Sequence, residues 1–162
     1  MSDKNKPYTR RDTLRLRGFD YASKRIYCVT VVVSERRRLF LDHRMARATI
    51  ECLIELRHTM GFNLYCYCLM PDHFHALIGP GESHKSLGEI LGAFKSLSTR
   101  RYWEWYDGRL WQRQFFDHII RNEQDFDETI TYILNNPVRR GLVANPGAWP
   151  YSGGLDLKLW DA

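Results

Sequence analysis

Two histidines separated by one residue are the side chains in this sequence with the clearest capacity for chemistry. Residues 69–79 read LMPDHFHALIG, which predicts a β-strand entered from a Pro-Asp turn. Side chains along a strand alternate between two faces, so His73 and His75 share one face and Phe74 lies on the other. Two neutral imidazoles directed at one point can bind a metal ion or accept a polar ligand. The alternative is a pair of histidines that only stabilise the fold.

A tyrosine nearer the end of the chain supplies a candidate nucleophile. Residues 124–136 carry apolar side chains at helical spacing, and Asn122 is a candidate N-cap. Tyr132 lies away from the apolar stripe of that helix, and Asn136 follows one turn later on nearly the same side. Pro137 disfavours helical geometry at Asn136, so the helix is expected to end there. A tyrosine hydroxyl beside a metal ion can attack phosphorus, whereas the alternative is an ordinary surface tyrosine.

Four cysteines could form a site of another kind: Cys28, Cys52, Cys66 and Cys68. No two of them have the C-x-x-C spacing that is typical of zinc sites. Cys66 and Cys68 alternate within an apolar strand and therefore share one face. Buried free thiols are the expected state, and zinc ligation together with His73 or His75 is the alternative.

The composition indicates a folded chain with a basic surface. Its 162 residues are 44% hydrophobic and 14% aromatic, which suits one domain, residues 1–162, with its own core. The net charge of +5 and the pI of about 9.1 favour an acidic partner. We find no run of about 18 apolar residues and no apolar segment near the N-terminus. Neither a membrane span nor a secretory signal is therefore expected, and a cytoplasmic location follows.

Strand and helix signals place these residues in a sheet covered by helices. The predicted strands are residues 25–33, residues 63–70, the histidine strand joined to them by a short Pro71-Asp72 connection, and a segment that begins at Phe115. The predicted helices run from Asp42 to about Met60 and from Ser86 to about Tyr106, where Gly108 breaks the second. The order β-α-β-β-α-β favours a ferredoxin-like α+β sandwich with an antiparallel sheet. The histidine strand would then be central, and the tyrosine helix could pack on the sheet's open face.

Three segments together resemble the HUH single-tyrosine transposases, a prokaryotic family that acts on single-stranded DNA. Residues 67–75 (YCLMPDHFH) resemble the HUH motif, residues 132–143 (YILNNPVRRGLV) the catalytic tyrosine region, and residues 111–121 (WQRQFFDHIIR) also match. Asn136 and the run at 149–152 (WPYS) make the chain most similar to the REP-associated tyrosine transposases. Members of that subfamily act on palindromic repeats that form hairpins.

The resemblance implies a role for each residue of the predicted site. His73 and His75 would bind a divalent ion, Mg²⁺ or Mn²⁺, with Asn136 as a third protein ligand. Tyr132 would attack a DNA phosphate, forming a 5′-phosphotyrosine and releasing a 3′-OH. The chain would thus be a metal-dependent single-strand DNA endonuclease and strand transferase of the nucleoid. Both monomers and homodimers occur in the family. The alternative is a domesticated protein that binds DNA hairpins without strand transfer.

Basic and aromatic side chains are candidates for holding the DNA. Residues 1–18 form a basic arm, and further candidates follow in the second predicted helix and beyond it; residues 145–162 form a tail without an assigned role. The nucleic-acid-binding candidates are Arg10, Arg11, Arg15, Arg17, Lys95, Arg100, Arg101, Arg109, Trp111 and Arg113. Arginine can contact phosphates or guanine edges, and Trp111 could stack on an unpaired base. The alternatives are solvated charges and, for Trp111, a core aromatic.

Overall fold

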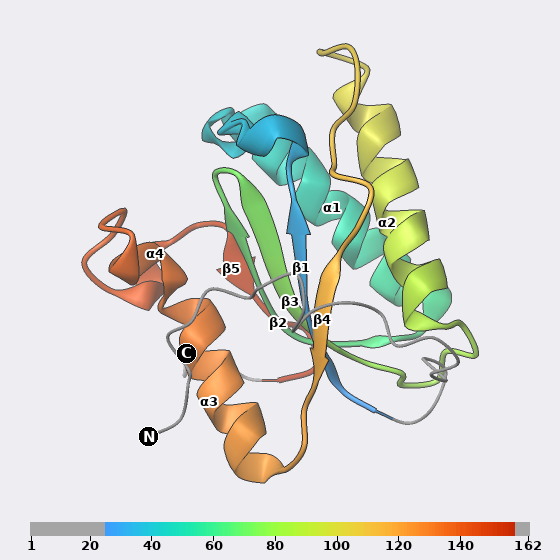
Figure 1. The fold of residues 1–162 in the computed structure, drawn as a ribbon, viewed down its shortest axis with the longest axis vertical. Coiled ribbons are helices and arrows are strands. Elements are labelled where there is room, and N and C mark those ends of the chain that lie inside the picture. Colours follow the sequence, from blue (N-terminus) through green and yellow to red (C-terminus); the bar gives the residue numbers. More distant parts are fainter. Residues whose placement is uncertain (1–24, 158–162) are drawn as a thin grey trace.

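An antiparallel sheet separates two layers of helices in the computed structural model, which describes residues 25–157 (Figure 1). In this range the strand order is β4-β1-β3-β2-β5. The strands are β1 (Tyr27–Val32), β2 (Asn63–Met70), β3 (His73–Gly79), β4 (Phe116–Ile119) and β5 (Ser152–Gly153). The helices are α1 (His43–Met60), α2 (Leu87–Tyr102), α3 (Glu123–Leu134) and α4 (Asn136–Arg139). The predicted ferredoxin-like α+β sandwich is confirmed. None of the described helices has the length and apolar character needed to cross a bilayer.

The histidine strand β3 lies at the centre of the sheet. It pairs with β1 on one side, where His73 is opposite Val32 and His75 is opposite Thr30. It pairs with β2 on the other side, where His75 is opposite Cys68. Every residue of β3 is buried. Hydrogen bonding along both edges therefore fixes which face each histidine occupies.

The two faces of β3 have different neighbours. Phe74, Ala76 and Ile78 belong to the core under α1 and α2, and the ring of Phe74 lies 5.0 Å from that of Phe94. On the other face, buried residues of β1, β2 and β3 pack against Ile133 and neighbouring residues of α3. Both expectations are confirmed: the apolar side chains of the histidine strand turn toward the helices, and α3 lies on the histidine face.

Capping residues set the ends of the helices. The Asp42 side chain accepts a hydrogen bond from the backbone N–H of Arg44, and Gly61, with a φ of 77°, ends α1. Ser86 and Glu89 form a capping box at the start of α2. The predicted starts of the two helices, at Asp42 and Ser86, are confirmed.

The predicted C-terminal end of α2 is wrong, because the helix stops at Tyr102 and not near residue 106. The Tyr102 hydroxyl donates to the Asp107 carbonyl at 2.9 Å, and the Trp103 indole donates to the Gly108 carbonyl at 2.8 Å. Side chains of the last turn thus bind the backbone that follows and fold it back on the helix.

A short strand in the C-terminal tail completes the sheet and is absent from the sequence prediction. In β5, Ser152 and Gly153 pair with Cys68 and Tyr67 of β2. The pairing covers an edge that β2 would otherwise present to solvent. Two residues are too short for an alternating pattern, which explains why the sequence alone does not predict this strand.

The position of Phe74 under the helices predicts the effect of removing its ring. Phe74→Ala should lower the free energy of unfolding by about 3–5 kcal/mol, because it leaves a cavity beside Phe94. Urea unfolding measures this loss, and Glu51→Ala, at an exposed position of α1, should change it by no more than about 0.5 kcal/mol. A loss below about 1 kcal/mol for Phe74→Ala would contradict its assignment to the core.

Candidate active site

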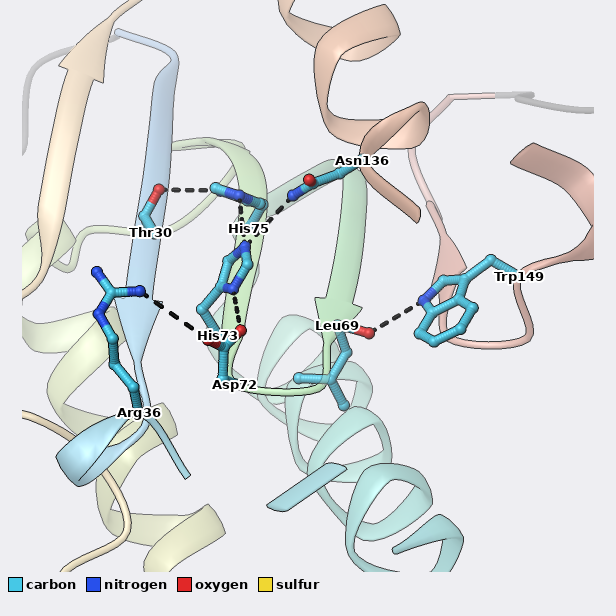
Figure 2. A network of polar contacts seen from close by, with 8 residues as sticks. All are labelled: Thr30, Arg36, Leu69, Asp72, His73, His75, Asn136 and Trp149. Carbon is cyan, nitrogen blue, oxygen red and sulfur yellow. Dashed lines mark hydrogen bonds and ion pairs between the residues drawn. The ribbon is translucent and has the colours of Figure 1, made fainter. Parts of the chain in front are cut away.

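The two histidines face each other on the sheet surface opposite α1 and α2 (Figure 2). The Nε2 atoms of His73 and His75 lie 3.1 Å apart, and the two rings are nearly perpendicular, with an interplanar angle of 85°. The two residues are 7% and 4% exposed. Strand alternation therefore brings both imidazoles to one point, as predicted.

The other ring nitrogen of each histidine, Nδ1, lies within hydrogen-bond distance of a neighbouring side-chain oxygen. Asp72 Oδ1 lies 2.6 Å from His73 Nδ1, and Thr30 Oγ1 lies 2.9 Å from His75 Nδ1. When both Nδ1 atoms donate these hydrogen bonds, both Nε2 lone pairs are available to one ligand. Such outer partners fix the orientation of metal-binding histidines and make them more basic.

The ionisation of these groups suits metal ligation. The hydrogen bond from His73 holds the pKa of Asp72 below its ordinary value, which keeps that residue a carboxylate. Burial, together with the nearby charges of His73, Arg139 and Arg140, holds the pKa of His75 well below its ordinary value. His75 is therefore a neutral imidazole near pH 7, the form that binds metal ions.

Asn136 brings a third side chain to the pair. Its Nδ2 lies 3.3 Å from His73 Nε2, and the residue is 4% exposed. Asn136 is the first residue of α4, which follows α3 after a break at Asn135. Pro137 lies in the first turn of α4, where its missing N–H costs nothing. The expectation that the helix ends at Asn136 is therefore corrected: α3 ends two residues earlier, and Pro137 helps to start a second helical turn.

The three side chains fit a hard divalent ion. Neighbouring ligands of an octahedral ion with bonds of about 2.1 Å are about 3 Å apart, close to the 3.1 Å and 3.3 Å found here. A half-turn of the Asn136 amide exchanges Nδ2 for the carbonyl oxygen that such an ion prefers. Among residues 25–157, no group of three or more His, Cys, Asp or Glu side chains could hold a metal. Within this range, Asn136 is the further side chain whose polar group lies within hydrogen-bond distance of His73 Nε2 besides that of His75.

The cysteines near the histidines are buried free thiols, as expected. Cys66 and Cys68 belong to the cluster of buried residues that packs against α3. Burial raises the pKa of Cys68 to about 11 and also raises that of Cys66. Both thiols are protonated near neutral pH, whereas a thiolate is the form that ligates zinc.

Tyr132 approaches the histidine pair from α3. Its ring centre lies 6.1 Å from that of His75, with an interplanar angle of 74°, and the residue is half-buried. Ile133, the next residue, is fully buried against the sheet. The ring of Tyr132 thus lies beside the histidines, near the end of α3, and Asn136 follows at the start of α4.

The candidate DNA contacts are scattered over several elements. Arg10, Arg11, Arg15 and Arg17 lie outside the described residues. Arg100, Arg109 and Arg113 are exposed. Arg101 is half-buried and pairs with Glu104 at 3.5 Å. Those arginines that the structure describes lie on α2 or in the segment that follows it.

Two of the candidates serve the fold. Lys95 Nζ donates to the carbonyls of Gln112, Arg113 and Gln114 at 2.8, 3.1 and 3.2 Å, so it fastens this segment to α2. Trp111 is 4% exposed, and its indole donates to Ser98 at 2.9 Å. The expectation that Trp111 stacks on a base is corrected, because its ring is buried in the core.

Some contacts around the site cannot be predicted from sequence patterns. Thr30 and Asp72 orient the histidines, but only the strand register and the turn geometry reveal their contacts. Arg36 lies in the left-handed region, with a φ of 51°, directly after Glu35 at 60°. Its guanidinium is 4.0 Å from Asp72. Two consecutive non-glycine residues with positive φ are uncommon and often occur at functional sites.

Comparison with known proteins identifies the family. The profile described as "Transposase IS200 like" matches residues 22–136, a range that includes both histidines, Tyr132 and Asn136. The chain belongs to this transposase family. The chain is 26% identical over 144 residues to a Haemophilus influenzae protein assigned as a REP-associated tyrosine transposase, with 82% of this chain and 81% of that protein covered. It is 27% identical over 129 residues to the REP-associated tyrosine transposase of Escherichia coli K12, with 76% and 72% covered.

A solved structure supports the same fold. A REP-associated tyrosine transposase bound to a REP hairpin superposes on this chain with a TM-score of 0.71. The two chains are 24% identical, and the alignment covers 86% of this chain and 81% of the other. The predicted likeness to the REP-associated transposases is therefore confirmed.

The hydrogen bond between Asp72 and His73 predicts a metal-binding defect. Asp72→Asn should weaken Mn²⁺ binding by about 10- to 100-fold, because an amide supports the imidazole less strongly than a carboxylate. Isothermal titration calorimetry measures the affinity. Asp107→Asn makes the same chemical change at an exposed residue and should bind Mn²⁺ like the wild type. Equal affinities for the two variants would show that Asp72 does not support a metal ligand.

Proposed function

We propose that this protein cleaves and rejoins single-stranded DNA, with Tyr132 as the nucleophile and a divalent ion at His73, His75 and Asn136. One observation carries the proposal. Tyr132 and Asn136 lie four residues apart at the junction of α3 and α4, and both reach the same histidine pair. The ring of Tyr132 lies 6.1 Å from that of His75, and the Asn136 amide lies 3.3 Å from His73.

The reaction proposed for Tyr132 is a transesterification. The phenolic oxygen attacks a DNA phosphorus, an O–P bond to Tyr132 forms, and the bond from phosphorus to the 3′ oxygen breaks. The proton leaves the tyrosine hydroxyl, and the departing 3′ oxygen gains one, so the product is a 5′-phosphotyrosine and a free 3′-OH. Attack by another 3′-OH reverses these steps and releases Tyr132. Since one ester replaces another, no nucleotide cofactor is needed.

The divalent ion, Mg²⁺ or Mn²⁺, would polarise the phosphoryl oxygens and offset charge in the transition state when bound. The protein's contribution is to hold the ligands in place. Asp72 and Thr30 orient the two imidazoles, and the backbone of β3 sets their spacing. The α3–α4 break aims Asn136 at the pair. These restraints reduce the reorganisation needed when ion and DNA bind.

Hairpin-forming DNA is the proposed substrate. A related REP-associated tyrosine transposase was solved with a REP hairpin, and the net charge of +5 suits a polyanion. The backbone N–H of Gln112 donates to the Val32 carbonyl, and Val32 is opposite His73. The segment that carries the exposed Arg113 therefore runs beside the sheet at the level of the histidines. We propose that Arg100, Arg109, Arg113 and the basic arm contact DNA phosphates.

The decisive experiment traps the covalent intermediate. Wild-type protein is mixed with Mn²⁺ and labelled hairpin oligonucleotides whose single-stranded flanks come from the DNA around its own gene. A labelled protein–DNA band should appear on a denaturing gel. Tyr132→Phe should abolish that band and leave hairpin affinity nearly unchanged, because it removes only the attacking oxygen.

Controls separate the nucleophile from the fold. Tyr65→Phe removes a hydroxyl from another tyrosine next to α3, one that packs on Phe126, and should leave the band intact. His73→Ala or EDTA should abolish it by removing the metal. A band formed by Tyr132→Phe would refute the assignment of the nucleophile. Tight hairpin binding without any band, across several flanks, would favour the alternative of a DNA-hairpin-binding protein without strand transfer.

A further inference from the structure

We propose that Arg139 is a positioning residue that holds the Tyr132 phenol against the histidine pair. The inference rests on the function proposed above, in which Tyr132 is the nucleophile. Arg139 lies seven residues after Tyr132, at the end of α4, and neither the sequence motifs nor the ligand geometry assigns it a role.

Arg139 is attached to Tyr132 at two points. Its guanidinium carbon lies 4.1 Å from the centre of the Tyr132 ring, and its Nη1 donates to the Tyr132 carbonyl at 2.9 Å. The first contact is a cation–π interaction, which the planar guanidinium makes by lying over an aromatic face. The second fixes the same group to the backbone. A side chain held at both points restrains the ring more than either contact alone.

The break between α3 and α4 makes this arrangement available. The Asn135 N–H still bonds the Thr131 carbonyl at 3.0 Å, but a new helix begins at Asn136. The Tyr132 carbonyl therefore lies at the junction, where the Arg139 side chain reaches it. The same break directs Asn136 to His73. One backbone feature therefore places the proposed metal ligand and leaves the Tyr132 carbonyl within reach of the Arg139 guanidinium.

The far end of α4 is also fixed. Gly141 has a φ of 70°, which ends the helix, and the Leu142 N–H donates to the Pro137 carbonyl at 2.9 Å. The backbone that carries Arg139 is thus closed into a short, defined turn. Arg139 itself is exposed, so its contacts with Tyr132 are not imposed by burial.

The consequence for Tyr132 is a defined ring position. The guanidinium covers the ring, which is itself half-buried and lies at 74° to the His75 ring. A half-buried phenol without such a partner can occupy other rotamers, and each departure from the reactive one lowers the rate. Arg139 would therefore speed the chemical step without contributing to DNA affinity.

Arg140 offers a matched control. It is the next residue, is also exposed and carries the same charge, while the contacts with Tyr132 are made by Arg139. Arg139→Gln and Arg140→Gln remove one positive charge from neighbouring positions. Cleavage rates are measured in single turnover with saturating Mn²⁺ and hairpin DNA, and affinity is measured separately. Arg139→Gln should be about 10- to 100-fold slower than Arg140→Gln at unchanged DNA affinity, because both variants remove a positive charge near His75 and Arg139→Gln also removes the contacts with Tyr132.

Arg139→Lys distinguishes position from charge. Lysine keeps the charge but lacks the planar group that covers the ring, so this variant should be as slow as Arg139→Gln. Restoration of the rate by lysine, equal rates for the two glutamine variants, or a loss confined to DNA affinity would each overturn the inference. Tyr132→Phe, run in parallel, keeps the two proposals apart. If it is inactive while Arg139→Gln cleaves normally, only the role of Arg139 fails; if it remains active, the proposed nucleophile fails.

Discussion

Pairing of β3 along both of its edges is the constraint on which the site depends. A strand held in register on two sides cannot rotate, so its alternation is fixed. Phe74 packs in the core under α1 and α2. His73 and His75 therefore both lie on the opposite face of the sheet. The core thus fixes the face of the two histidines, and their rings, which contact Asp72 and Thr30, place the Nε2 atoms 3.1 Å apart. A slip of one residue would reverse both faces, which would bury the histidines under the helices and expose the core side chains.

The geometry of the site also depends on the break between α3 and α4. The break at Asn135 divides the segment into α3, which packs on the histidine face, and α4, which begins with Asn136. A continuous helix would keep Tyr132 and Asn136 one turn apart on its surface. The break instead lets the ring approach His75 while the amide reaches His73. Proline contributes by tolerating the first turn of α4 and by withholding an N–H from the end of α3.

The sequence predicts the parts of the fold that are governed by local rules. The caps at Asp42, Gly61 and Ser86 give the ends of the helices. Strand alternation around Phe74 gives the shared face of the two histidines. The end of α2 is not predictable in this way, because it depends on hydrogen bonds from Tyr102 and Trp103 to a later loop.

Contacts between residues distant in the sequence account for the remaining differences. Thr30 meets His75 only through the β1–β3 register, and β5 has too few residues to show a pattern. A tryptophan ring such as that of Trp111 can stack on a base, but this ring is buried in the core. The resemblance predicts the roles of His73, His75, Asn136 and Tyr132, and the structure brings these four side chains together. The basic arm lies outside the described residues.

The central claim is that one divalent ion binds His73, His75 and Asn136 beside Tyr132. Anomalous diffraction from crystals soaked in Mn²⁺ and measured at the manganese absorption edge tests it most directly. A single strong peak should lie within bonding distance of His73 Nε2, His75 Nε2 and the Asn136 side-chain oxygen. A peak at other residues, or no peak from crystals that diffract well at saturating Mn²⁺, would contradict the claim.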